Sequence, residues 1–226
     1  MPQQPLHDWQ PVPTPAHKPL DGQYVRVEPL DPTRHSDDLW QALQGPDSDP
    51  RLWDYLPYGP FSERAAFDTW LSGQAASRDP LFFSVIDLRQ QRAVGLLSFL
   101  RITPKDGCIE IGHIAFGRAM QRSPASTEAV YLLAKLALGE LGYRRLEWKC
   151  NAANARSMRA AKRLGFSYEG LFRQHMVVKG ENRDTAWFAI LDSEWQACNA
   201  AFKHWLAADN FNANGQQQQR LEDMRN

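Results

Sequence analysis

The chain has 226 residues, of which 43% are hydrophobic, and its 26 lysine and arginine residues balance 26 aspartate and glutamate residues. This length suits one well-packed domain with additional segments at its ends. A net charge of zero provides no general positive field, so we expect no binding to DNA and no electrostatic binding to a membrane surface.

The cysteines and the apolar segments exclude further classes of protein. The three cysteines include no Cys-x-x-Cys pair, which fits a reducing compartment and indicates no zinc site, so no metal is expected. The longest strongly apolar run, residues 94–100, is far shorter than the ~20 residues of a membrane helix, and the proline-rich start lacks a signal-peptide core. We therefore expect a cytoplasmic protein.

The spacing of apolar residues predicts the elements in chain order. Residues 1–19 contain six prolines and predict an extended arm. There follow a strand from residue 24, a helix over 35–43, an aromatic loop over 52–61, a helix from residue 62, and strands over 81–88, 93–102 and 108–116. The second half predicts a helix over 124–141, a strand over 145–150, a helix over 154–164, hairpin strands over 167–178 and 185–191 with a turn over 179–182, and a C-terminal helix with a capping box from Ser193 to Gln196. We expect a single domain over 20–208 and a loose polar tail over 209–226.

The segment from residue 108 to residue 166 carries the strongest functional signal. An isolated glycine, Gly112, suggests a bulge in the first strand. After the loop at Gln121 and Arg122, Ser123 is a good N-cap and Pro124 suits the first helical position. The amides at a helix start lack partners within the helix and the macrodipole is positive there, so a pyrophosphate could bind. This arrangement points to a bound acyl-coenzyme A.

The combination of motifs resembles a known family. The strand at 108–116, the loop Gln121-Arg-Ser-Pro-Ala-Ser126, and the run Asn154-Ala-Arg-Ser157 followed by Lys162-Arg-Leu-Gly-Phe166 are similar to those of the GNAT superfamily of N-acetyltransferases. The likeness is greatest to the ribosomal-protein N-terminal acetyltransferase branch. It implies a mixed α+β fold, with a twisted, mostly antiparallel sheet flanked by helices. It also implies acetyl-CoA as co-substrate and a primary amine as acceptor, either a protein N-terminus or a small molecule.

The resemblance assigns roles to two residues. Glu110 matches a position where related enzymes often place an acid that removes the amine proton, although a plain strand glutamate is the alternative. Ser157 matches a serine that can hydrogen-bond the sulfur and donate a proton, although it could be an ordinary helix-surface residue. His113 is a second choice of base, because a single histidine in an apolar strand is more often structural.

The remaining candidates surround these two residues. For the cofactor they are Ile114, Ala115, Phe116, Gln121, Arg122, Ser123, Ala125, Ser126, Thr127, Asn154, Ser157 and Lys162. For the acceptor they are Tyr55, Tyr58 and Arg173, where the two tyrosine hydroxyls can point into a cleft.

One departure from the family pattern leaves an alternative open. Pro124 stands where the family loop has its middle glycine, so one amide that would face the pyrophosphate is absent. The chain is therefore expected to be an acetyl-CoA-dependent N-acetyltransferase, as a monomer or a homodimer. The alternative is a catalytically silent acyl-CoA-binding or protein-interaction module on the same fold.

Overall fold

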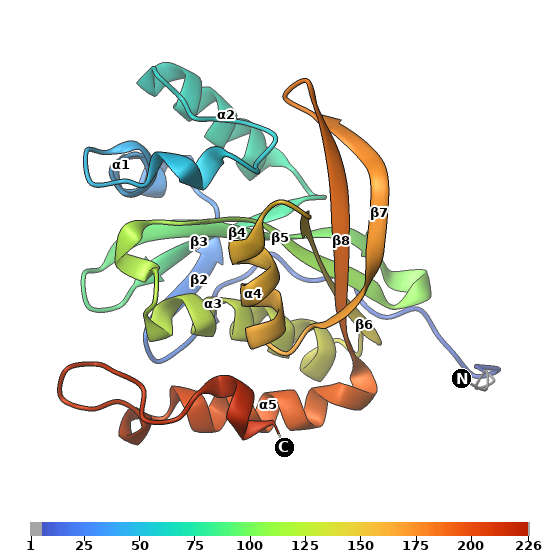
Figure 1. Cartoon of the computed structure of the whole chain (residues 1–226). Coiled ribbons are helices and arrows are strands. Elements are labelled where there is room, and N and C mark those ends of the chain that lie inside the picture. The colour runs from blue at the N-terminus through green and yellow to red at the C-terminus, as the bar shows by residue number, and fades with distance from the viewer. Residues whose placement is uncertain (1–5, 226) are drawn as a thin grey trace.

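Eight strands form one mixed sheet in the computed structural model, which describes residues 6–225 (Figure 1). The strand order is β1-β2-β3-β4-β5-β6-β8-β7. The strands are β1 (Leu20–Asp21), β2 (Val25–Pro29), β3 (Leu81–Asp87), β4 (Arg92–Thr103), β5 (Cys108–Phe116), β6 (Arg145–Asn151), β7 (Ser167–Val178) and β8 (Glu181–Leu191). The main helices are α1 (Pro32–Gln44), α2 (Arg64–Ala76), α3 (Pro124–Ala134), α4 (Ala155–Arg163) and α5 (Asp192–Leu206). The predicted α+β class, with a mostly antiparallel sheet flanked by helices, is confirmed.

The helices cover both faces of the sheet. In Figure 1, α1 and α2 lie above the sheet, and α3 and α5 lie below it. The upper core contains Leu39, Phe67 and Leu96, and the larger lower core contains Ile111 and Phe202. Each face therefore has its own apolar core, and strand residues alternate between the two.

The parallel pair β5 and β6 is joined only at its beginning. Within the described chain, its register runs from Cys108 opposite Arg145 to Glu110 opposite Glu147 and then stops. Beyond Glu110, β5 continues to Phe116 beside β4, whereas β6 continues to Asn151 beside β8. The two strands therefore diverge, and each presents an unpaired backbone edge to the gap.

A bulge in β5 changes which face its side chains reach. His113 has φ +50°, and the register with β4 shifts between Gly112 opposite Ser98 and Ala115 opposite Leu96. Before the bulge, Ile111 packs in the lower core, and after it Ala115 packs in the upper core. The bulge that Gly112 predicted therefore exists, and the residue in the left-handed conformation is the next one.

Three local predictions differ from the structure. The last hairpin turns in two residues, because Lys179 and Gly180 both have positive φ, so β8 begins at Glu181 rather than at residue 185. The helix α5 begins earlier than the Ser193 capping box predicted, and Glu194 accepts a hydrogen bond from the amide of Leu191 at 2.8 Å. The residue-124 helix is α-helical to Ala134 and continues as a π-helix over Lys135–Glu140.

The two terminal segments pack against the domain. In the arm, the Trp9 indole donates to the carbonyl of Lys105 at 2.8 Å and lies under the guanidinium of Arg144. In the tail, Leu221 is fully buried, and Arg225 donates to the carbonyl of Lys162 at 3.1 Å. The tail is therefore not loose, because Leu221, together with Phe211 and Met224, packs against the core. The first five residues of the predicted arm lie outside the described residues.

Candidate active site

A cleft of about 290 Å³ opens where β5 and β6 diverge. Its lining comes from the aromatic loop before α2, from β4, β5 and β6, from the start of α4, and from the β7–β8 hairpin. Lys179 ties the hairpin to the loop, because its ammonium donates to the carbonyls of Trp53 at 2.9 Å and Gly59 at 2.6 Å. The cleft therefore has a bridged rim rather than two independent walls.

The alternation of the strands places two polar groups on opposite faces of this gap. Glu110 lies between Ile109 and Ile111, which both face the lower core, so its side chain faces the side of α1 and α2. Ser157 lies on the other side, where its hydroxyl accepts a hydrogen bond from the Trp148 indole at 3.0 Å. Both residues line the cleft. The gap therefore offers a carboxylate on one side and a hydroxyl on the other.

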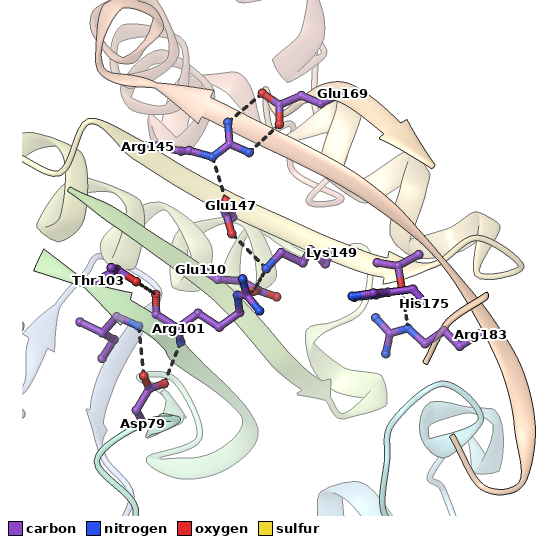
Figure 2. A network of polar contacts seen from close by, with 12 residues as sticks. Asp79, Arg101, Thr103, Glu110, Arg145, Glu147, Lys149, Glu169, His175 and Arg183 are labelled. Carbon is purple, nitrogen blue, oxygen red and sulfur yellow. Dashed lines mark hydrogen bonds and ion pairs between the residues drawn. The ribbon is translucent and has the colours of Figure 1, made fainter. Parts of the chain in front are cut away.

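Glu110 is held in a row of alternating charges, which Figure 2 shows. Its carboxylate is 2.6 Å from the Lys149 ammonium and 3.6 Å from Arg101 Nε. Lys149 also contacts Glu147 at 3.0 Å, and Arg145 joins Glu147 to Glu169. Only 5% of Glu110 is exposed, and this burial raises its pKa, while the charge of Lys149 opposes the rise. A carboxylate with a raised pKa is a stronger base than an ordinary glutamate side chain.

Ser157 is fixed by the start of α4. The side chain of Asn154 caps this helix, because its oxygen accepts from the Ser157 amide at 3.1 Å. Since the Ser157 oxygen already accepts from Trp148, its own proton is directed elsewhere. The hydroxyl lies at the edge of the gap, where the neighbouring Cys150 thiol is also within its hydrogen-bonding reach.

His113 is enclosed by aromatic rings. Its Nδ1 lies 2.8 Å from the Tyr58 hydroxyl, the two rings stack, and Phe82 lies against the imidazole. Burial lowers the pKa of His113 to about 4. An imidazole with this pKa is a weak base at neutral pH.

The phosphate-binding loop predicted by the sequence follows β5. The Ser123 hydroxyl donates to the Met120 carbonyl at 2.7 Å and does not cap α3. The start of α3 therefore has no side-chain cap, so its first amides remain available to an anion. Arg122 has φ +59°, which gives the loop a tight turn directly before the helix. The free edges of β5 and β6 and this helix start together fit an extended molecule with an anionic end.

The comparisons with known proteins agree with this geometry. Residues 26–167 match the family described as acetyltransferase (GNAT) domain. The chain belongs to the GNAT family. A GCN5-related N-acetyltransferase from Brucella melitensis is 46% identical in sequence, with a TM-score of 0.93, over 97% of this chain and 99% of that one. The uncharacterized N-acetyltransferase YnaD of Bacillus subtilis is 28% identical over 69% of this chain and 89% of its own length.

The likeness to the ribosomal-protein branch lies in the fold. The ribosomal L7/L12 α-N-protein acetyltransferase RimL has a TM-score of 0.67 and 19% identity, over 80% of this chain and 99% of that one. A shared fold does not determine which acceptor an enzyme uses, so this likeness does not identify the acceptor of the chain.

The residues predicted to bind the cofactor lie in two parts of the structure. Ile114, Asn154 and Ser157 line the cleft. The others follow β5 toward the start of α3 or lie on helices: Ala115, Phe116, Gln121, Arg122, Ser123, Ala125, Ser126, Thr127 and Lys162. Among these, Thr127 is buried and its hydroxyl accepts from Arg163 at 2.9 Å, so it is engaged within the protein. Lys162 is exposed on α4.

The predicted acceptor residues are not all brought together. Tyr55 lines the cleft, and its hydroxyl donates to the Ala153 carbonyl at 3.2 Å. Tyr58 contacts His113 instead of the open cleft, and Arg173 is exposed on β7 outside the lining. The cleft is lined instead by two charged residues that sequence reasoning did not single out, Lys149 and Arg183. A lone charge in a strand carries no signal of its own, and only the sheet register brings Lys149 to Glu110 and Arg183 into the same cleft.

Two absences concern the described residues 6–225. No group of three or more histidine, cysteine, aspartate or glutamate side chains there is placed to hold a metal ion. No helix in that range is long and apolar enough to cross a membrane.

Proposed function

We propose that this chain transfers an acetyl group from acetyl-CoA to a primary amine within a ternary complex. The observation that carries the proposal is the pair of polar groups at one gap, with Glu110 on the face of α1 and α2 and Ser157 on the face of α3. Direct transfer needs a proton acceptor on the amine side and a proton donor on the thiol side. The divided gap supplies both.

The residues of this chain would act in the following way. The open edge of β5 from Ile114 to Phe116 would hold the pantetheine arm, and a backbone N–H there would polarise the thioester carbonyl. Glu110 would accept a proton from the acceptor ammonium, directly or through water, so that the neutral amine forms the new C–N bond. As the C–S bond breaks, the hydroxyl of Ser157 would stabilise the leaving thiolate or protonate it, and the proton that the attacking nitrogen loses would replace the one that the hydroxyl gives up.

The binding of the anionic end falls to the start of α3. The amides of Ala125 and Ser126 belong to its first turn, where the helix dipole favours a pyrophosphate. Pro124 supplies no amide, which favours the second candidate, an acyl-CoA-binding or protein-interaction module without turnover. We further propose that the protein acts in the cytoplasm, as a monomer or a homodimer and without DNA.

One assay separates the two candidates. Acetyl-CoA is incubated with the protein and a panel of small amines and peptides, and free thiol is measured over time. Amine-dependent thiol release that Glu110→Gln strongly reduces is the expected result. Coenzyme A binding in calorimetry without thiol release for any acceptor would instead support the silent module.

A further inference from the structure

We propose that the acceptor amine also carries a carboxylate, and that Arg183 binds this carboxylate and so determines specificity. The inference rests on the proposed acetyl transfer and names the class of its acceptor. It starts from the position of Arg183 on β8, in the lining of the cleft and on the hairpin that covers it.

Arg183 is oriented by one hydrogen bond and is otherwise free to bind a ligand. Its Nε donates to the Thr185 hydroxyl at 3.2 Å, and the same hydroxyl contacts His175 Nδ1 at 3.0 Å. Figure 2 shows Arg183 beside His175. Within residues 6–225, no carboxylate lies within 4.0 Å of the Arg183 nitrogens. A fixed guanidinium with two free terminal nitrogens has the geometry that binds a carboxylate through two parallel hydrogen bonds.

The other two cations of the cleft are already engaged. The Lys149 ammonium contacts Glu110 and Glu147, and it lies 3.9 Å from the centre of the Trp187 ring. Arg101 contacts Glu110 and lies over the same ring. Arg183 is therefore the cation of this cleft whose charge is left for a ligand.

The charge balance of the cleft favours an anionic acceptor. Among the described residues, Lys149 and Arg101 are offset by Glu110 and Glu147, which leaves the charge of Arg183 as the positive excess of the lining. Burial also lowers the pKa of Arg183, which reflects the cost of holding an unpaired charge away from water. A ligand carboxylate would offset that cost, whereas a purely cationic amine would be repelled.

The anionic groups of coenzyme A do not explain this charge. Alternation along β8 puts Arg183 on the same face as Thr185 and Trp187, and Trp187 lies over Lys149, beside Glu110. The phosphate-binding start of α3 follows the far end of β5, under the opposite face of the sheet. Arg183 therefore belongs with Glu110 on the acceptor side, and an acceptor that reaches both needs an amine and a carboxylate in one small molecule or chain end.

Matched pairs of acceptors test the inference. The small pair is 4-aminobutanoate and 4-aminobutan-1-ol, and the peptide pair has N-terminal glutamate or glutamine with the same remaining sequence. Wild-type kcat/KM should be about 10- to 100-fold higher for the carboxylated member of at least one pair, and the pair that responds identifies the source of the carboxylate. Arg183→Gln should remove this preference mainly through KM, and Arg183→Lys should restore part of it.

The controls separate this inference from the proposed reaction. Arg220→Gln changes one exposed arginine of the tail and should leave both rates unchanged. Thermal melting verifies that the Arg183 variants fold. Equal wild-type rates within both pairs would overturn the inference while leaving acetyl transfer intact, and so would an Arg183→Gln variant that loses rate equally for both members. No thiol release with any amine would instead refute the proposed function.

Discussion

Replacing Lys149 by methionine tests whether Glu110 is the base. The substitution keeps most of the side-chain volume but removes the ammonium that contacts Glu110 at 2.6 Å and Glu147 at 3.0 Å. The side chains of Lys149 and Glu110 are 6% and 7% exposed, so solvent cannot replace the lost partner. Removing one member of a buried pair costs about 3–5 kcal/mol, which lowers the melting temperature of a protein of this size by roughly 6–20 °C.

The sign of the pH effect follows from the same contacts. Lys149 lowers the pKa of Glu110, so its removal raises that pKa further above the unfolded value. An acid with a raised folded pKa stabilises the protein at low pH and loses that contribution as pH rises through the folded pKa. The stability deficit of Lys149→Met should therefore be smaller in acid than at neutral pH.

The kinetic assay is the pH profile of kcat/KM. Because only the ionised carboxylate accepts a proton, the acidic limb of the profile should move to higher pH in Lys149→Met. Arg145→Met is the matched control, since Arg145 contacts Glu147 and Glu169 in the same row but not Glu110. A folded Lys149→Met enzyme with the wild-type acidic limb would refute the assignment of Glu110 as the titrating base.

Four other substitutions address the remaining roles. Glu110→Gln should lower turnover about 10²–10⁴-fold with coenzyme A affinity nearly unchanged. His113→Asn should retain more activity, because burial lowers the pKa of His113 to about 4. If steady-state kinetics gave the reverse ranking of the two variants, the histidine would be the base. Ser157→Ala should lower kcat and kcat/KM together at a similar KM, and a wild-type kcat on a good acceptor would show that this hydroxyl is dispensable. Ser126→Asp, in the first turn of α3, should weaken coenzyme A binding by about 1–3 kcal/mol in calorimetry, and an unchanged affinity would contradict phosphate binding there.

The elements with strong local signals could be predicted from the sequence. The bounds of β5 and β7 agree with the alternation that predicted them, and Pro124 does begin α3. The hairpin turn was predicted too long, and the start of β8 too late, because Lys179 adopts a positive φ that its side chain does not favour. The packing of the tail was missed because its few apolar residues, such as Leu221 and Met224, are widely spaced in a polar sequence and show no periodicity.

The candidate site was predictable only where a motif marks it. The helix start at Asn154 and Ser157 comes from a recognisable run, and the structure places both in the cleft. The contact of Lys149 with Glu110, and the place of Arg183 in the same cleft, depend on strand pairings between residues far apart in the sequence. The register of strand pairing depends on the tertiary structure, so the sequence alone does not show that charges in separate strands belong to one site.

The short pairing of β5 with β6 also has a mechanical consequence. Because their ladder ends at Glu110 and Glu147, the sheet consists of two half-sheets that share a narrow hinge: β1 to β5 on one side, and β6, β8 and β7 on the other. If the pantetheine arm of coenzyme A formed hydrogen bonds with both open backbone edges, it would take the place of a strand between them. At a free ligand concentration of 100 times Kd, binding would then add about 2.7 kcal/mol to the free energy of unfolding. The donor substrate would complete the fold as well as take part in the reaction.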